Sequence, residues 1–387
     1  MKKKIAIIGS TGSIGKSLID ILKKNKKEIE IILLTADKNY QEILLQAKFF
    51  NVKNLIITNR DIYLKLKKNK VSKKVNIYND YDAFKTIFKK KIDYTMSSIS
   101  GLNGLLPTIK IIKHTKKIAI ANKEGIICAW NLISKELNKY KTKFIPVDSE
   151  HFSLWYGLQG SSVKSVEEIY LTASGGPLYK TSLKKFKNIK KSQALNHPNW
   201  SMGKKISIDS ATMINKIFEV IEAKKIFDIS YDKIKIIIHP KSYIHAILKF
   251  DNGLTKIIVH DTTMKVPIFN TLFFDDMRNL KSKKLDIKVL NQLELDSVNL
   301  KRYPMIKLLD LIPKHHSLFE TLIVSANDIL VEKFLNNEIK FVDIQKNLFK
   351  ILKYKEFLKF KKIKPHNINE IIKLNDYVRL KINRMSI

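Results

Sequence analysis

The feature that most constrains the fold is a glycine-rich turn close to the N-terminus. The apolar run Lys3 to Ile8 has the character of a strand, and the sequence GSTGSIG (residues 9–15) follows it at once. Residues 16–22 then have helical spacing. Strand, glycine turn and helix in this order bring backbone close to a pyrophosphate at a helix N-terminus, so the stretch predicts a dinucleotide site. The spacing is GxxGxxG rather than GxGxxG, and an ordinary glycine-rich turn is the alternative.

Strands and helices continue to alternate as far as about residue 150. We expect strands at residues 30–36, 54–58, 93–99, 117–121 and 143–145, and helices at residues 39–50, 80–89 and 105–112. Repeated βαβ units build a doubly wound parallel sheet, because each crossover helix packs back onto the sheet. The fold class is therefore α/β at this end, with residues 1–148 predicted to form a Rossmann-like domain.

Polar residues follow the second predicted strand, at the position where a Rossmann fold contacts the adenosine ribose. They are Asp37, Lys38 and Asn39. A carboxylate at Asp37 suits the free 2′-hydroxyl of NAD, whereas the ammonium of Lys38 suits the 2′-phosphate of NADP. The two residues indicate opposite cofactors, and their spacing does not decide between them.

Two later strands also end in polar groups. Asn122, Lys123 and Glu124 follow the strand at 117–121, and Asp148 and Glu150 follow the strand at 143–145. Ligands bind at the carboxyl ends of strands in open α/β sheets, and carboxylate oxygens are the donors that Mg²⁺ or Mn²⁺ selects. The alternative is structural: the first group caps a helix as a polar turn, and Asp148 or Ser149 starts the next helix.

The pattern changes after residue 150. A predicted strand at 168–173 runs into Ser174-Gly175-Gly176-Pro177, which can offer N–H groups and a hydroxyl to an anion or can be a bare turn. The segment from His197 to Gly203 contains Trp200 and Met202. Loops seldom hold large apolar side chains unless they close over something, so this segment is a candidate lid, with a satellite apolar cluster as the alternative.

A helix is predicted to start at Asp209 and to run to about Phe227. Asn215, Lys216 and Glu219 share one side of it, and Glu222 continues that side, where it could be a solvated acid. Ser210 at the helix start, with Asn215 and Lys216 nearby, makes a plausible phosphate cradle. The alternative is that Ser210 only caps the helix and Lys216 only pairs with a carboxylate.

The remainder of the chain divides into three predicted parts. Residues 149–275 form an α+β domain with strands at 235–239, 243–250 and 254–260, a hairpin turn at Asn252-Gly253, and a lid loop at 174–204. The chain is expected to be irregular from Phe269 to Asn299, with a linker at 276–300. Residues 301–387 are predicted to be a bundle with helices at 305–311, 318–336, 341–353 and 368–384, and it offers no catalytic constellation.

The net charge of +36 is the most conspicuous property of the composition. Of the 72 basic residues only five are Arg, and Lys is spread along the whole chain. Specific nucleic-acid readers concentrate Arg, so a solvated lysine surface is favoured over a nucleic-acid face. The single Cys128 excludes an internal disulfide, no apolar run is long enough to span a bilayer, and the apolar run after Met1 is too short for a signal peptide. We therefore expect a cytoplasmic protein.

Together these motifs resemble one family, the 1-deoxy-D-xylulose 5-phosphate reductoisomerases of the non-mevalonate isoprenoid pathway. The likeness runs in order through residues 9–15, 121–124, 146–151, 174–177, 197–203, 209–219, 238–240 and 302–304. The resemblance implies an enzyme that rearranges 1-deoxy-D-xylulose 5-phosphate by retro-aldol cleavage and re-addition. NADPH then reduces the resulting aldehyde to 2-C-methyl-D-erythritol 4-phosphate. The resemblance also implies a homodimer.

The resemblance further implies roles for individual residues. Asp148, Glu150 and Glu219 would hold one Mg²⁺, Mn²⁺ or Co²⁺ ion, and with Lys123 and His197 they would form the catalytic set. Trp200 and Met202 would shield the reaction from water. The implied substrate contacts are Lys123, Ser149, Glu150, Ser174, His197, Ser210, Asn215, Lys216 and Glu219. The implied cofactor contacts are Thr11, Gly12, Ser13, Ile14, Asp37, Lys38, Asn39, Asn122, Glu124 and Gly203.

Three departures from the family pattern qualify this picture. Asp37 stands where the family usually has Gly, so we expect Lys38 to favour NADPH while discrimination against NADH is weakened. Residues 261–267 depart from the usual Pro-Asp-Met-Arg run before Pro, and Asp328 replaces the usual Glu. Two other functions compete with the one implied: a metal-free Rossmann reductase of another phosphorylated substrate, and a basic nucleic-acid-binding protein.

Overall fold

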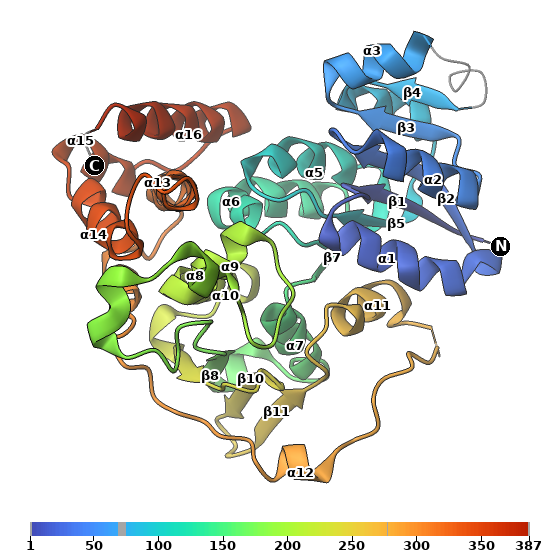
Figure 1. The fold of residues 1–387 in the computed structure, drawn as a ribbon. Helices are drawn as coiled ribbons and strands as arrows, with labels where there is room; N and C mark the ends of the chain where they lie inside the picture. The colour runs from blue at the N-terminus through green and yellow to red at the C-terminus, as the bar shows by residue number, and fades with distance from the viewer. Residues whose placement is uncertain (1, 69–74, 277, 386–387) are drawn as a thin grey trace. The chain divides into compact units, whose positions relative to one another are not determined.

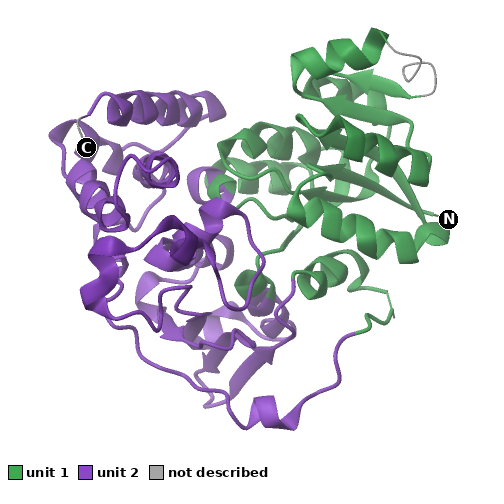
Figure 2. Ribbon diagram, in the orientation of Figure 1, with its two compact units in different colours: residues 1–125, 131–152, 264–281 green, residues 126–130, 153–263, 282–387 purple. Residues whose placement is uncertain are grey.

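The computed structural model describes residues 2–68, 75–276 and 278–385, and the chain forms two compact units. Unit 1 comprises residues 1–125, 131–152 and 264–281, and unit 2 comprises residues 126–130, 153–263 and 282–387 (Figure 2). The four-part division expected from the sequence remains a prediction of domain boundaries.

Unit 1 is built on a parallel sheet, as predicted for a Rossmann-like domain. Its described residues form seven strands in the order β4-β3-β2-β1-β5-β6-β7, and every neighbouring pair is parallel. The strands are β1 (Lys3–Ile8), β2 (Ile29–Ala36), β3 (Asn54–Ile57), β4 (Asn76–Tyr78), β5 (Ile92–Ser97), β6 (Thr115–Ile120) and β7 (Lys143–Pro146). The strand order reverses between β1 and β5, and such a switch point is where open α/β sheets bind ligands.

Helices cover this sheet because its strands are apolar on both faces. They are α1 (Ser13–Lys24), α2 (Tyr40–Phe50), α3 (Arg60–Lys68), α5 (Leu105–Ile112), α6 (Lys123–Lys139) and α11 (Lys265–Phe273). The helix α7 (Ser149–Gly157) instead places Leu154 in the core of unit 2. Leu18 and Leu22 of α1 share the core with Ile5 and Ile7 of β1. The helix α11 is far from α1 in the sequence, but the two helices pack side by side (Figure 1). Leu272 of α11 is fully buried in the same core.

The sequence prediction was wrong at three places in this unit. The expected helix at 80–89 is broken into a 3₁₀ turn, Tyr81–Ala83, and the short α4, Phe84–Ile87, which stops because Phe88 is extended. The sequence prediction also missed the lysine-rich α3 and β4, which has only three residues. The expected irregular stretch begins too early, because residues 269–273 are the end of α11 and are buried against the sheet.

Unit 2 contains a smaller, mixed sheet. Its order is β11-β10-β8-β9, antiparallel except for the parallel pair β8/β9. The strands are β8 (Val166–Ala173), β9 (Ile234–Ile238), β10 (Ile244–Phe250) and β11 (Thr255–Val259). The hairpin predicted at Asn252-Gly253 is confirmed: Gly253 has a φ of +82° and donates its N–H to the carbonyl of Phe250.

The helix predicted from Asp209 to Phe227 is two helices. The first, α9 (Lys204–Thr212), ends at Met213, whose φ is +69°, and α10 (Ile214–Phe227) begins directly after it. A left-handed conformation costs a non-glycine residue about 1–2 kcal/mol. The Met213 side chain is 2% exposed and packs with Ala173, Ile238 and Tyr303, and this burial offsets the cost. The apolar spacing continues through the break, so the sequence did not reveal it.

The C-terminal part is helical, as predicted. It contains the 3₁₀ helix η8 (Pro304–Leu311) and the helices α13 (Phe319–Leu335), α14 (Phe341–Leu352), α15 (Lys355–Leu358) and α16 (Ile368–Asn383). Almost every side of α13 is buried, because α14 and α16 both pack against it (Figure 1). None of the helices in the described ranges combines the length and the apolar character that crossing a membrane requires.

Candidate active site

The glycine turn of unit 1 places the start of α1 tightly against the end of β1. A Cβ atom on Gly15 would lie 2.3 Å from the carbonyl oxygen of Gly9, and one on Gly9 would lie 2.9 Å from the Ile99 side chain. Both positions therefore require glycine. The predicted cofactor contacts Thr11, Gly12, Ser13 and Ile14 lie on this turn beside the switch point, where the N-terminal amides of α1 can meet a pyrophosphate.

The carboxylate of Asp37 is held in place at the end of β2. It accepts a hydrogen bond of 2.9 Å from the hydroxyl of Thr58, which lies just beyond β3. Burial, with a contribution from the charge of Asp37, raises the pKa of Tyr81 to about 12, so the phenol stays neutral. Lys38 is exposed beside Asp37, and Asn39 caps α2 by accepting the N–H of Glu42. The end of β2 thus carries one hydrogen-bonded negative charge and one exposed positive charge.

Asn122 is a structural residue as well as a predicted cofactor contact. Its side chain is buried, accepts the N–H of Gly125 at 2.7 Å and donates to the carbonyl of Gly101 at 2.8 Å. These bonds cap α6 and connect it to the loop after β5. Lys123 and Glu124 follow in the first turn of α6, where both are half-buried.

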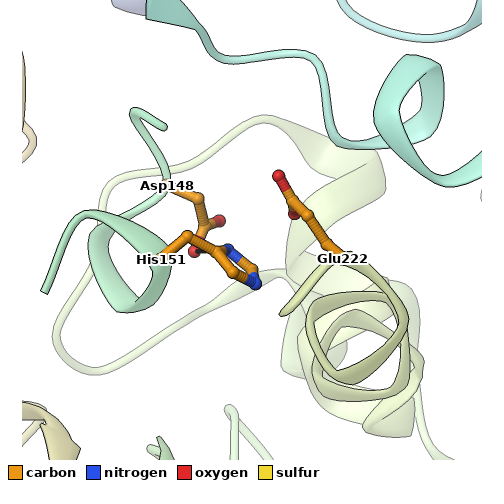
Figure 3. A group of neighbouring side chains, drawn as sticks. All are labelled: Asp148, His151 and Glu222. Atoms are coloured by element: carbon orange, nitrogen blue, oxygen red, sulfur yellow. Dashed lines mark hydrogen bonds and ion pairs between the residues drawn. The ribbon is translucent and has the colours of Figure 1, made fainter. Parts of the chain in front are cut away.

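Asp148 is the centre of the polar group at the end of β7. Its carboxylate lies 3.0 Å from the ammonium of Lys123 and 3.1 Å from Nδ1 of His151. Asp148 and His151 are turned toward each other (Figure 3). Burial opposes ionisation, but Lys123 and His151 outweigh it and hold the pKa of Asp148 well below its ordinary value. The carboxylate is therefore ionised, which is the form that binds a cation.

The three residues that follow Asp148 complete this group. The hydroxyl of Ser149 donates a 2.6 Å hydrogen bond to the carboxylate of Glu150, and His151 is fully buried. Asp148 and Glu150 accordingly leave the strand together, as predicted. Sequence reasoning gave no role to His151, although its position three residues after Asp148 at a helix start was a usable signal, because such residues face each other.

In unit 2, the turn at Ser174-Gly175-Gly176 lies directly against the end of α9. Gly176 has a φ of +68°, and a Cβ atom there would lie 2.7 Å from the carbonyl oxygen of Ser210. Its N–H also donates to the hydroxyl of Ser174 at 3.0 Å. The turn therefore brings together the segments of two predicted phosphate contacts. Ser210 lies in the last turn of α9, so the prediction that it starts a helix was wrong.

The lid candidate, residues 197–203, contains no helix or strand and is held by hydrogen bonds. Nδ1 of His197 accepts the backbone N–H groups of Asn199 and Trp200, at 3.2 and 3.1 Å, so the ring proton is on Nε2, 3.0 Å from the hydroxyl of Ser174. Burial lowers the pKa of His197 to about 4, and the ring is neutral at pH 7. The amide of Asn199 donates to the Pro240 carbonyl and to the Ser242 hydroxyl.

The first turns of α10 carry the remaining predicted residues. Glu219 is 1% exposed; its carboxylate accepts a 2.5 Å hydrogen bond from Asn215 and pairs with Lys216, itself 4% exposed. The three residues thus form one polar group at the positive end of a helix dipole. Glu222, one turn further along α10 (Figure 3), is buried rather than solvated. Gly203 is the residue that precedes α9.

A doubly wound sheet with a glycine turn at its switch point is typical of enzymes that use a dinucleotide cofactor. Family models agree in detail. The model for 1-deoxy-D-xylulose 5-phosphate reductoisomerase matches residues 5–130, and two models for the C-terminal domains of the same enzyme match residues 144–227 and 260–381. The chain belongs to the 1-deoxy-D-xylulose 5-phosphate reductoisomerase family.

Individual relatives support this assignment over the whole length. The reductoisomerase of Pelagibacter ubique (strain HTCC1062) is 58% identical over 387 residues, which is 100% of both chains. The Zymomonas mobilis enzyme, solved in complex with NADPH, has a TM-score of 0.87 and 30% identity, covering 98% of each chain. A reductoisomerase solved with NADPH, fosmidomycin and magnesium has a TM-score of 0.88 and 29% identity, covering 98% of this chain and 97% of the other. The predicted fold class is confirmed.

Proposed function

We propose that this chain catalyses the rearrangement and NADPH-dependent reduction of 1-deoxy-D-xylulose 5-phosphate to 2-C-methyl-D-erythritol 4-phosphate, with one divalent cation, in non-mevalonate isoprenoid precursor synthesis. The observation that carries the proposal is the full-length identity of 58% with the Pelagibacter ubique reductoisomerase. The solved relatives that contain NADPH and magnesium support the cofactor and the metal.

For the cation we propose Asp148, Glu150 and Glu219 as ligands. Among the described residues they make up one of two groups that could hold a metal ion, the other being Asp148, His151 and Glu222. The first group offers only carboxylate oxygens, and these suit Mg²⁺, Mn²⁺ or Co²⁺ with Mg²⁺ and Mn²⁺ favoured by hard donors. A bound cation supplies Lewis acidity to the substrate oxygens. The ionised state of Asp148 supports its assignment as a ligand.

For the substrate phosphate we propose a cradle made of Ser174, Ser210, Asn215 and Lys216. Unit 2 places the Ser174 turn against the backbone of Ser210, and Lys216 brings a buried ammonium to the positive end of α10. His197 presents a ring N–H beside Ser174 and can donate it to a phosphate or sugar oxygen. Trp200 and Met202, on the same loop, exclude water from the reacting atoms.

Nearer the reacting carbons we propose Lys123, Ser149 and Glu150. Lys123 holds the Asp148 carboxylate in its ionised form and adds a positive charge where the substrate gains negative charge. For NADPH we propose contacts from Thr11, Gly12, Ser13 and Ile14 to the pyrophosphate, from Asp37, Lys38 and Asn39 to the ribose and its phosphate, and from Asn122, Glu124 and Gly203 elsewhere along the nucleotide. In unit 1, the glycine turn and the end of β2 supply the contacts proposed for the pyrophosphate and the ribose.

The same proposal includes a homodimer and a cytoplasmic location. The edge strand β11 leaves Ile257 52% exposed, and Leu254 beside it is 65% exposed, an arrangement that a second copy of the chain can cover. The chain has one cysteine, the buried Cys128, and therefore no internal disulfide to maintain, which agrees with a reducing compartment.

The direct test of the proposed function follows NADPH oxidation with 1-deoxy-D-xylulose 5-phosphate after removal of metal with EDTA and again after addition of Mg²⁺ or Mn²⁺. We expect no turnover in EDTA and recovery with either ion. Full turnover in EDTA would instead support a metal-free reductase. Saturable nucleic-acid binding with a steep salt dependence, in a protein without turnover, would support the nucleic-acid alternative.

A further inference from the structure

A buried polar cluster connects the C-terminal helix α13 with the helix that carries Ser210. Asp209 and Asn327 are 2% and 0% exposed, and the Asn327 amide donates a 2.8 Å hydrogen bond to the Asp209 carboxylate. These residues are 118 positions apart in the chain. A carboxylate in such a place must be fully hydrogen-bonded, since an unsatisfied buried charge costs several kcal/mol.

Lys205 completes the cluster from the other side. Its ammonium lies 2.9 Å from the second oxygen of Asp209 and 3.1 Å from the carboxylate of Asp328, the residue after Asn327. It also lies over the ring of Phe218, 5.8 Å from its centre, on α10. Asp209 is thus held between a lysine of its own helix and an asparagine of α13.

What Asp209 does to its neighbour follows from the local backbone. Ser210 is the next residue, in the last turn of a nine-residue helix that ends at the left-handed Met213. Helices this short take their position from tertiary contacts rather than from their own stability. The carbonyl of Ser210 in turn lies against Gly176, with no room for a Cβ atom. A shift of Asp209 therefore moves Ser210 relative to the Ser174 turn.

We infer that Asn327 is a positioning residue for the substrate phosphate: through its hydrogen bond to Asp209 it sets the distance between Ser210 and the Ser174 turn. This inference rests on the proposed function, because it assumes that Ser174 and Ser210 bind the phosphate. The C-terminal helices would then take part in substrate binding, although their sequence offers no catalytic side chains.

The variant that tests the inference is Asn327→Leu, compared with Ser325→Ala. Ser325 is fully buried on the same helix two residues earlier, so it controls for damage to the packing of α13. We expect Asn327→Leu to raise KM for 1-deoxy-D-xylulose 5-phosphate about tenfold, the effect of losing a hydrogen bond to a charged group. The Kd for NADPH, measured by fluorescence without substrate, should stay unchanged, and Ser325→Ala should leave both constants unchanged.

A double-variant cycle separates positioning through Asp209 from a general loss of stability. In the background of Asp209→Ala, adding Asn327→Leu should change KM by less than about twofold, because the shared contact is already absent. An equal tenfold increase in that background would overturn the inference. So would a normal KM in Asn327→Leu together with a lowered Tm, which would show a purely structural bond. Wild-type protein that does not turn over the substrate would refute the proposed function itself, a result distinct from either.

Discussion

The predicted site residues of unit 1 and those of unit 2 are positioned in different ways. In unit 1 the predicted cofactor residues lie on turns that directly follow strands, so the local sequence fixes them once the sheet forms. In unit 2 the proposed phosphate cradle depends on contacts between distant segments. The hydroxyl of Tyr303, for example, donates a 2.8 Å hydrogen bond to the carbonyl of Gly175, and Arg302 donates to the carbonyls of Leu178 and Thr181.

This difference indicates in which unit a substitution far from the site residues should change activity. A doubly wound sheet tolerates changes away from its strand ends, because the backbone ladder holds the ligand-binding turns. In unit 2, Ser210 lies outside any sheet, so no strand pairing fixes its position. The geometry of the proposed cradle therefore depends on the side-chain contacts that hold Ser210. We therefore expect sensitivity to remote substitutions in unit 2 and mainly local effects in unit 1.

The largest effect is expected from Gly176→Ala. The new Cβ atom would lie 2.7 Å from the Ser210 carbonyl, so the two segments must separate, and displacement by about 1 Å can lower kcat/KM about 100-fold. The matched control is Gly160→Ala: Gly160 also has a positive φ, +73°, but nothing lies within 4 Å of its Cβ position. Steady-state kinetics and Tm should be measured for both variants. If both lose kcat/KM and Tm equally, backbone strain alone causes the loss, and the close contact with Ser210 does not.

A smaller effect is expected at the ribose position of unit 1. Asp37→Gly should raise the selectivity for NADPH over NADH, as a ratio of kcat/KM, by about tenfold, because a fixed negative charge beside the 2′-phosphate costs ~1.4 kcal/mol at an exposed position. Thr58→Val removes the hydroxyl that holds the carboxylate at 2.9 Å and should move selectivity in the same direction by less. Unchanged selectivity in Asp37→Gly would remove Asp37 from the ribose site.

The smallest effect is expected on the pH dependence of stability, to which buried histidines of both units contribute. Burial lowers the pKa of His114 in unit 1, and of His197 and His316 in unit 2, to about 4 in each case. The unfolded chain, with histidines near pKa 6.5, binds more protons between those values, so stability is full above pH 6.5 and falls as the pH drops toward 4. Thermal unfolding at pH 7 and pH 4.5 should show this fall, and it should be shallower in His114→Leu. An identical slope in that variant would contradict the assignment to His114.

How much the sequence predicted follows the same division. All the parallel strands except the short β4, and the residues at their ends, were found because apolar runs and glycine turns are local signals. The break at Met213 was not, since a buried methionine in a left-handed conformation leaves the apolar spacing intact. The contact of Asn327 with Asp209 was also missed, because a lone polar residue in an apolar helix does not say which distant group it meets.

The central proposal is that the carboxylates of Asp148, Glu150 and Glu219 hold one cation that the reaction needs. The most direct measurement is Mn²⁺ binding by electron paramagnetic resonance, with turnover measured on the same samples, in Glu219→Gln and in Glu222→Gln. We predict that Glu219→Gln abolishes turnover and weakens Mn²⁺ binding at least about tenfold while NADPH binding is kept, and that Glu222→Gln retains the ion. Normal Mn²⁺ binding and turnover in Glu219→Gln would contradict the claim.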